Sequence, residues 1–384
     1  MSNSKFNYEK EIRKFEKQLV KLSKITRDKF NIELQNELSL LFSRKTKEIK
    51  NKLRLNKIDQ NKKNTPAKSS LSNKNLEKLP SWVKDEIDES SIVGNSNKVI
   101  QTPDKRKYHL DNKLNDLSGG EWTFFLNSVI TTRYSTSGAD SYAHEIRKIH
   151  PSPKPPQLMR QIIEFFTKER GLVFDYFMGV GGTLLGASLC NRKAIGIDLS
   201  GKYISAYKKA TKALNLVEQK TLQADSVNFL KKTSEFSKFL NEEEIDLILI
   251  DPPYGDMMAR EKTGEAAKNK KSSEATPFTN MEVDLGNMEW KKFREVFKDT
   301  IKNATKNLKD KGHIVIFIKD LQPKNGDPNL LHADLIKDIN NVDKINYLGT
   351  KIWGDLSVNL YPYGYPHSYV SNQIHQYILI FRKG

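Results

Sequence analysis

The stretch LVFDYFMGVGGTLLGASLCNRKAIGIDLS, residues 172–200, decides the fold of this chain. Its apolar run from Leu172 to Phe174 is typical of a strand buried in a parallel sheet, and a turn with three glycines follows at once. A chain that turns sharply and brings its backbone close to a ligand needs residues without a Cβ atom. The stretch therefore predicts a strand, a ligand-binding glycine turn, a helix and a second strand of an α/β fold.

Three details of this turn narrow the choice of ligand. No Gly-Lys-Ser/Thr follows, so the phosphate-binding lysine of a nucleotide hydrolase is missing. The spacing of Asp175, Phe177, Gly179 and Gly181 puts a carboxylate at the strand tip, where it suits the cationic amino group of an amino-acid-like ligand. Asp198, 19 positions after Gly179, fits a ribose-binding carboxylate or a helix N-cap. Dehydrogenases share this last feature, whereas the first two favour S-adenosylmethionine (SAM).

A second signature, IDLILIDPPYG, occupies residues 245–255. It predicts a buried strand that ends in Asp251, Pro252, Pro253 and Tyr254, and the two prolines fix a rigid, extended exit. The Asp251 carboxylate and the Pro252 carbonyl then accept hydrogen bonds from an exocyclic amino group, while the Tyr254 ring stacks on its heterocycle. Accepting both hydrogens frees the nitrogen lone pair for attack on a sulfonium methyl group, and Asp251 stabilises the developing positive charge.

A third strand is predicted just before residues 223–226. Asp225 follows its end and is predicted, from its spacing, to meet the adenine amino group of the cofactor.

The two signatures together resemble those of the amino-group DNA methyltransferases, which modify adenine N6 or cytosine N4. HPSPKPPQLMRQIIEFF, residues 150–166, is similar to the family segment that helps to close the cofactor pocket, with Lys154 in its Lys-Pro position. The resemblance covers about residues 145–384. It implies a Rossmann-like SAM-dependent methyltransferase fold, with a seven-stranded, mostly parallel sheet and an antiparallel C-terminal hairpin. Strand-like patterns at 312–320 and in two later segments agree with this expectation.

The resemblance also implies that an aromatic side chain near the C-terminus packs on the flipped base. The loop NLYPYGYPHSYVSN, residues 359–372, supplies the base-stacking candidates Tyr361, Tyr363 and Tyr365. Two features depart from the family pattern. The cofactor half precedes the catalytic half, which is a permuted order relative to many members with this Lys-Pro segment, and no long target-recognition domain fits. Residues 255–287 form a charged, Gly- and Ser-containing insertion, which predicts a mobile loop that closes on DNA.

The formal net charge of the 384 residues is +17, which suits a polyanionic partner such as nucleic acid. Residues 1–70 alone carry +11. Apolar residues spaced three and four apart predict a basic, coiled-coil-like helical segment at 1–55 that packs on the protein or on a partner. A flexible linker is predicted at 56–75, an accessory region that docks on the core at 76–149, and the catalytic domain at 150–384.

Several classes of protein are excluded or disfavoured by composition. The hydrophobic fraction is 37%, and no stretch approaches the roughly 18 apolar residues of a membrane-spanning helix. The N-terminus lacks a signal-peptide pattern, and Cys190 is the only cysteine, so we expect a cytoplasmic protein without a disulfide. We assign no metal site and no membrane partner.

The sequence thus predicts a DNA methyltransferase that binds SAM and double-stranded DNA and acts on a flipped base. The resemblance implies a preference for adenine N6, because Asp and not Ser precedes the two prolines. Three alternatives remain at this stage: a cytosine-N4 enzyme, an RNA guanine-N2 methyltransferase, and a non-catalytic DNA-binding subunit. The N-terminal helices are candidates for contacts with a partner subunit or a second copy. The resemblance implies a restriction-modification role or a solitary enzyme.

Overall fold

The computed structural model describes residues 17, 65–253, 255, 278–279, 281–321 and 330–384. Contacts between Cα atoms divide the chain into two units, residues 1–64 and 65–384. Apart from Lys17, the predicted helical segment at 1–55 lies outside the described residues, and so does the first part of the predicted linker.

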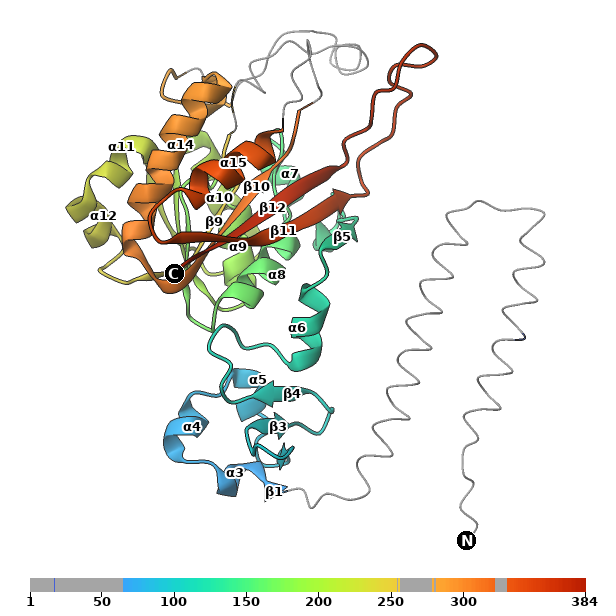
Figure 1. Ribbon diagram of the computed structural model, residues 1–384, viewed down its shortest axis with the longest axis vertical. Helices are drawn as coiled ribbons and strands as arrows, with labels where there is room; N and C mark the ends of the chain where they lie inside the picture. Colours follow the sequence, from blue (N-terminus) through green and yellow to red (C-terminus); the bar gives the residue numbers. More distant parts are fainter. Residues whose placement is uncertain (1–16, 18–64, 254, 256–277, 280, 322–329) are drawn as a thin grey trace. The chain divides into compact units, whose positions relative to one another are not determined.

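The second unit holds two sheets (Figure 1). The region before residue 150 contains these elements: β1 (Thr65–Pro66), α3 (Ala67–Ser70), α4 (Asn73–Glu77), α5 (Ser81–Lys84), β2 (Ser91–Val93), β3 (Val99–Gln101), β4 (Lys107–His109), α6 (Gly119–Phe125), β5 (Val129–Thr132), η2 (Ala139–Ser141) and α7 (His144–Arg147). The cofactor half contains α8 (Pro156–Phe166), β6 (Leu172–Asp175), α9 (Gly182–Leu189), β7 (Lys193–Asp198), α10 (Gly201–Ala213), β8 (Lys220–Gln223), α11 (Ser226–Lys231) and α12 (Thr233–Phe239). The C-terminal half contains β9 (Ile245–Ile250), η4 (Leu285–Asn287), α14 (Trp290–Ala304), η5 (Thr305–Asn307), β10 (Leu308–Ile318), α15 (Leu331–Asn340), β11 (Ile345–Asp355) and β12 (His375–Lys383).

The large sheet has the strand order β5-β11-β12-β10-β9-β6-β7-β8. All its neighbouring strands are parallel except at β12, which pairs antiparallel with both β10 and β11. The predicted α/β class, the mostly parallel sheet and the antiparallel C-terminal hairpin are confirmed. The expected number of strands is wrong, because β5 adds an eighth strand at the edge by pairing parallel with β11.

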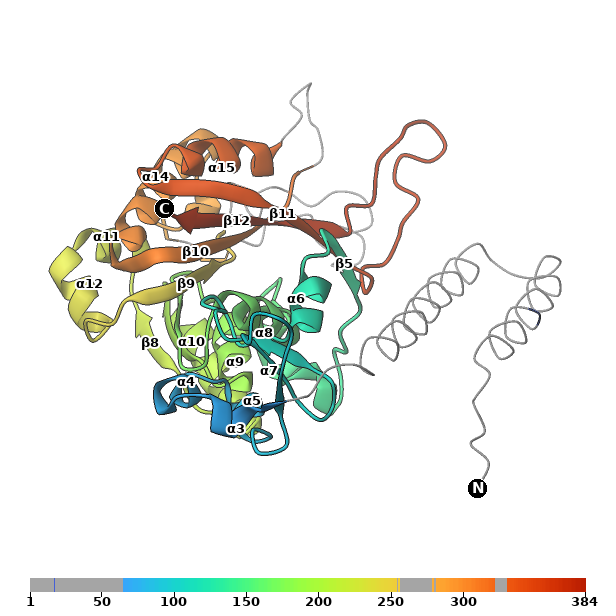
Figure 2. The ribbon, with the colours of Figure 1, turned by 60° about the horizontal axis from the view of Figure 1, so that its bottom comes forward.

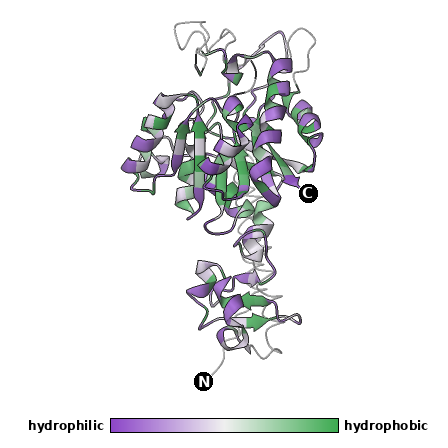
Figure 3. Ribbon diagram, turned by 90° about the vertical axis from the view of Figure 1, so that its left-hand side faces the viewer, coloured by the Kyte–Doolittle hydropathy of each residue, from purple (hydrophilic) through white to green (hydrophobic). Residues whose placement is uncertain are grey.

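The central strands β6 and β9 are almost wholly buried because helices cover both faces of the large sheet (Figures 2 and 3). Successive side chains of a strand point to opposite faces, and β9 shows this well. Ile248 and Ile250 join one core with residues of α12, α14 and α15, whereas Leu247 and Leu249 join another with residues of α8, α9 and α10. The two cores hold the strand ends of β6, β7 and β9 in register.

The small antiparallel sheet, with the order β1-β2-β3-β4, has a core of its own that includes Ala67 and Ile100. The linker prediction therefore does not hold for residues 65–75, which form β1, α3 and most of α4 and contribute a fully buried alanine. The sequence pattern did not predict these elements, because the segment is polar and each element is shorter than the window needed to detect periodicity.

Residues 76–149, the predicted accessory region, belong to the same unit as residues 150–384. Asp116 is a key residue: it pairs with the buried Arg192 at 3.2 Å and accepts a hydrogen bond from the Glu169 backbone at 2.5 Å. Of the aromatic residues of α6, Phe125 stacks on Phe165 of α8 at 3.9 Å. Trp122 packs there too, whereas Phe124 is 66% exposed.

Candidate functional site

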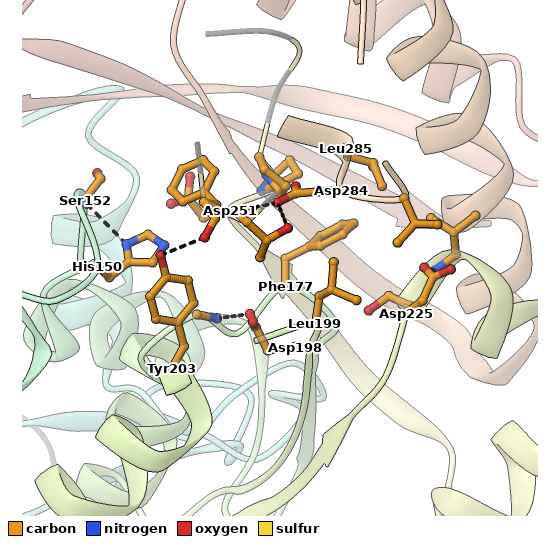
Figure 4. A pocket seen from close by; sticks show the side chains of 18 of the residues that line it. His150, Ser152, Phe177, Asp198, Leu199, Tyr203, Asp225, Asp251, Asp284 and Leu285 are labelled. Atoms are coloured by element: carbon orange, nitrogen blue, oxygen red, sulfur yellow. Dashed lines mark hydrogen bonds between the residues drawn. The ribbon is translucent and has the colours of Figure 1, made fainter. Parts of the chain in front are cut away.

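A cavity opens at the carboxyl ends of β6, β7, β8 and β9, where parallel α/β sheets bind ligands. It encloses about 810 Å³ when its open side is counted. Figure 4 shows side chains from several separate segments pointing into it. The lining residues are His150, Ser152, Lys154, Phe177, Gly179, Asp198, Leu199, Tyr203, Asp225, Ser226, Val227, Asp251, Pro252, Pro253, Phe278, Thr279, Val283, Asp284 and Leu285.

Asp198, at the end of β7, lines this cavity, and each of its carboxylate oxygens accepts one backbone hydrogen bond. Its Oδ2 accepts the Gly179 N–H at 2.8 Å, and its Oδ1 accepts the Ser200 N–H at 2.8 Å. The N-cap of α10 is Ser200, so the N-cap alternative for Asp198 is wrong. A carboxylate offers about four acceptor positions, and two are left for ribose hydroxyls. Burial raises the pKa of Asp198 to about 6, against the two backbone hydrogen bonds.

Asp175, the last residue of β6, lines a smaller neighbouring cavity of about 340 Å³ together with Lys154, Phe177 and Gly179. Its Oδ1 accepts the Phe177 N–H at 3.0 Å, and its side chain also bonds Thr183. Burial raises the pKa of Asp175 to about 7, against these hydrogen bonds. A buried carboxylate without a charged partner is well suited to a cationic group such as a ligand ammonium.

Asp225 lines the large cavity at the end of β8, but it also has a structural role. It is the N-cap of α11, where its Oδ1 accepts the Val227 N–H at 2.9 Å and its Oδ2 accepts from Asn228 at 2.6 Å. Next to it, Phe177, Leu199 and Leu285 give the cavity apolar walls suited to a flat ring.

Asp251, directly after β9, forms an ion pair that the sequence did not predict. Its Oδ2 lies 2.5 Å from Nζ of Lys154, and the side chains are 20% and 7% exposed. Lys154 Nζ also lies 5.4 Å from the centre of the Phe317 ring. Burial raises the pKa of Asp251, and the charge and hydrogen bond of Lys154 oppose this effect. Lys154 therefore contacts the predicted catalytic carboxylate as well as both cavities.

Pro252 and Pro253 line the same cavity, so the described part of the predicted catalytic tetrapeptide is brought together with the predicted cofactor residues. Tyr254 and most of the predicted mobile loop, residues 256–277 and 280, lie outside the described residues.

Residues at the described end of that loop form part of the wall of the large cavity. Asp284 accepts hydrogen bonds from Thr279 N–H at 3.0 Å and from Gly286 N–H at 2.9 Å, which closes a turn. Leu285 is 3% exposed and belongs to the main core. Sequence reasoning missed these lining residues because the segment is polar overall, and one buried leucine gives no periodic signal.

His150 is another lining residue to which the sequence gave no role. Its ring stacks on Phe278 at 5.1 Å and meets Tyr203 edge to face at 4.9 Å. Burial lowers the pKa of His150 to about 4, with Lys154 adding to the effect, so the ring is neutral at pH 7. Its place at the start of the Lys-Pro segment was the available signal.

The glycines of the turn have different tasks. Gly179, with φ +49°, lines both cavities, and a Cβ there would lie 3.4 Å from the His150 ring. Gly181 lines neither cavity: with φ +75° it faces the Tyr207 ring, which a Cβ would approach to 2.2 Å. Gly181 is predicted from the sequence to bind the cofactor, but in the structure it packs against Tyr207 of α10.

The base-stacking candidates lie on the loop between β11 and β12, which projects beyond the sheet in Figure 1. Tyr361 and Tyr363 contact each other at 5.7 Å, and Tyr365 is 82% exposed. None of the three lines the cavities described above, so the structure does not bring them to Asp251. The reason is local: the loop's backbone hydrogen bonds run largely within it and do not hold it on the sheet edge.

The residues of the two cavities fit SAM. Asp175 offers a buried carboxylate for an ammonium, Asp198 has free acceptor positions for a ribose, and the glycine cradle at Gly179 leaves space that side chains would fill. In the described part of the chain, no three His, Cys, Asp or Glu side chains gather as ligands of a metal ion.

Comparison with known proteins agrees with this geometry. Residues 1–209 match the model of the N6/N4 amino-group DNA methylase family. The chain is 32% identical over 151 residues to a tRNA (guanine(10)-N2)-dimethyltransferase of Methanocaldococcus jannaschii, which covers 38% of this chain and 41% of that protein. It is 38% identical over 66 residues to the type II methyltransferase M2.DpnII of Streptococcus pneumoniae, covering 17% and 25%. The solved structure of TrmN from Thermus thermophilus aligns with a TM-score of 0.38 at 14% identity, covering 62% and 52%.

The chain belongs to the N6/N4 amino-group DNA methylase family, and the predicted cofactor, SAM, is that of the family. It spans less than half the length of the curated relatives that it matches. Among the described residues, no helix combines the length and apolarity needed to cross a membrane.

Proposed function

We propose that this protein transfers a methyl group from SAM to the exocyclic amino group of a flipped DNA base, with adenine N6 as the first candidate. One observation carries the proposal: Asp251, Pro252 and Pro253 line the same cavity as Asp198 and Phe177. Family membership supports DNA as the substrate. The preference for adenine rests on Asp, and not Ser, before the two prolines.

The cofactor half of the site holds and orients the methyl donor. Bound SAM supplies an electrophilic sulfonium methyl group. In this proposal Asp198 accepts the ribose hydroxyls, Asp175 pairs with the ammonium, and Phe177 and Leu199 pack on the adenine. Asp225 keeps its acceptor role at the α11 N-cap while it faces the same ring.

Asp251 and Lys154 act at the amino group of the substrate. Lys154 occupies Oδ2 of Asp251, which leaves Oδ1 and the Pro252 carbonyl to accept the two amino hydrogens. The nitrogen then attacks with its lone pair, a nitrogen–carbon bond forms and a sulfur–carbon bond breaks. Asp251 stabilises the positive charge on nitrogen, and one proton leaves afterwards. Lys154 holds the carboxylate in place, and its charge and hydrogen bond oppose the rise in the pKa of Asp251 that burial causes.

The direct test is methylation with labelled SAM of genomic DNA and, separately, of tRNA, followed by nucleoside analysis. We expect N6-methyladenine in DNA. N4-methylcytosine would move the assignment to cytosine, and the absence of both products from DNA would refute the proposal. Asp251→Ala should lose turnover while SAM affinity, measured by calorimetry, stays within a few-fold. Asp343→Ala, on an exposed turn before β11, is the matched control and should remain active.

A second candidate is guanine-N2 methylation of structured RNA. The similarity to the archaeal tRNA enzyme, 32% identity over 151 residues, favours it. N2-methylguanosine in tRNA, without any methylated base in DNA, would establish this alternative.

A further inference from the structure

A second cavity lies beside the cofactor site, and of its lining residues only Lys154 has a part in the proposed chemistry. We call it the Arg147 pocket. It encloses about 760 Å³ when its open side is counted. Its lining residues are Tyr134, Ser135, Thr136, Ser141, His144, Arg147, Pro151, Ser152, Pro153, Lys154, Pro155, Gln157, Trp353, Asp355, Ser357 and Gln376.

The strand directions put this pocket at the same edge of the large sheet as the cofactor cavity. β11 runs parallel to β9, because both β11 and β10 pair antiparallel with β12 while β10 is parallel to β9. Trp353 and Asp355 at the end of β11, and Gln376 at the start of β12, therefore lie at the edge where Asp251 ends β9. Ser152 and Lys154 line both cavities and separate them.

Arg147 places a buried positive charge at the wall of the pocket. Its side chain is 1% exposed, and within the described residues no carboxylate forms an ion pair with it. Nε donates to the Tyr142 carbonyl at 3.1 Å and Nη1 to the Lys154 carbonyl at 2.9 Å. These bonds use two of the five N–H donors of a guanidinium. Burial alone lowers the pKa of Arg147, to about 10, so it remains charged at pH 7.

Two other polar atoms in this pocket have no hydrogen-bond partner among the residues that the structure describes. The Oε1 atom of Gln376 is buried without a hydrogen bond, and the buried hydroxyl of Tyr134 is near Thr132 without a well-formed bond. Buried polar atoms are nearly always bonded in folded proteins, because each unpaired atom costs about 1–3 kcal/mol. Two such atoms beside a buried guanidinium on one cavity indicate a polar ligand.

The surroundings favour an oxyanion beside Arg147. Thr136 brings a hydroxyl group, a common contact of nucleic-acid phosphates, whereas the hydroxyls of Ser135 and Ser141 donate to the Ser137 and Gly138 carbonyls. Among the described residues that line the pocket, Asp355 is the only acidic one, and its Oδ1 accepts hydrogen bonds from Ser357. Burial lowers the pKa of His144, which keeps that ring neutral and able to bind by hydrogen bonds.

We propose that the Arg147 pocket binds a backbone phosphate of the nucleic-acid substrate next to the target nucleotide, with Arg147 as the charged contact. Gln376 and Tyr134 then bond the sugar or base attached to that phosphate. The proposal rests on the proposed function, since it needs a nucleic-acid substrate. The other source of an oxyanion is the carboxylate of SAM, and the experiment below separates the two.

The test measures binding of the full-length protein to a mixed-sequence DNA duplex and to tRNA over a series of salt concentrations. One phosphate contact contributes about 0.9 to the slope of log affinity against log salt for duplex DNA. Arg147→Gln should lower that slope by about this amount and weaken binding about tenfold or more. SAM affinity should stay unchanged. The control is Arg160→Gln, which removes an exposed arginine paired with Glu164 on α8 and should change neither quantity by much.

A second variant guards against a folding defect, because Arg147 also supports two backbone carbonyls. Gln376→Glu leaves those bonds intact and puts a competing carboxylate in the pocket, so it should reduce the slope and the affinity in the same way. Loss of SAM affinity with an unchanged slope in Arg147→Gln would identify the cofactor carboxylate and overturn the proposal. Unchanged binding in Gln376→Glu would overturn it too. Failure of the unmutated protein to bind either nucleic acid would remove the proposed function as well.

Discussion

Replacing Asp175 with asparagine should stabilise the protein without cofactor at alkaline pH. The carboxylate is 3% exposed at the end of β6, and burial raises its pKa to about 7 from an ordinary 3.8. The folded protein therefore binds a proton at pH values where the unfolded chain has already lost it. Stability is full below about pH 3.8, falls as the pH rises, and stays low above about pH 7.

The size of the effect follows from the shift in pKa. One pKa unit corresponds to about 1.4 kcal/mol, so the whole change from 3.8 to about 7 is about 4 kcal/mol. Asparagine has nearly the same shape, keeps an acceptor for the Phe177 N–H, and does not titrate. The free energy of unfolding of Asp175→Asn minus that of the unmutated protein should therefore grow by about 3 kcal/mol between pH 5 and pH 8.

Urea denaturation of both proteins at several pH values is the assay. Asp299→Asn, at an exposed position of α14, is the control and should show no such growth with pH. If the unmutated protein instead gained stability over the variant as the pH rose, the carboxylate would be stabilised by folding and our account of its burial would be wrong. Calorimetry gives a second readout: the variant should bind SAM more weakly because the partner of the ammonium is lost.

Two further predictions concern packing and the N-terminal segment. Gly181→Ala should lower the free energy of unfolding, measured by urea denaturation, by about 2–5 kcal/mol, because its Cβ would lie 2.2 Å from the Tyr207 ring on a backbone with φ +75°. The control Gly94→Ala, with φ +88° and open space around it, should lose only about 1–2 kcal/mol from backbone strain. Equal losses in the two variants would exclude the clash with Tyr207. Deleting residues 1–64, which leaves the small sheet complete, should weaken DNA binding more than SAM binding, and equal losses in the two binding assays would make the segment a structural part of the core.

The sequence alone determined the parts of the fold that depend on neighbouring residues. Apolar runs too short for helices predicted β6, β9 and β10, and the glycine turn and the two prolines fixed where chemically active residues leave the sheet. Asp198 and Asp251 were placed for that reason, since strand ends in a parallel sheet meet at one edge. The cofactor class followed from the same local patterns.

Only the tertiary structure decided contacts between residues far apart in the chain. The ion pair between Lys154 and Asp251 joins positions 97 apart. The four-residue strand β5 exists because β11 provides its partner more than 200 positions later. No apolar periodicity around Arg147 predicts its burial, yet packing buries it. Local periodicity shows which face of a helix or strand is apolar, but it does not show which other elements pack on that face. Burial, pKa values and cavities all depend on those packing partners.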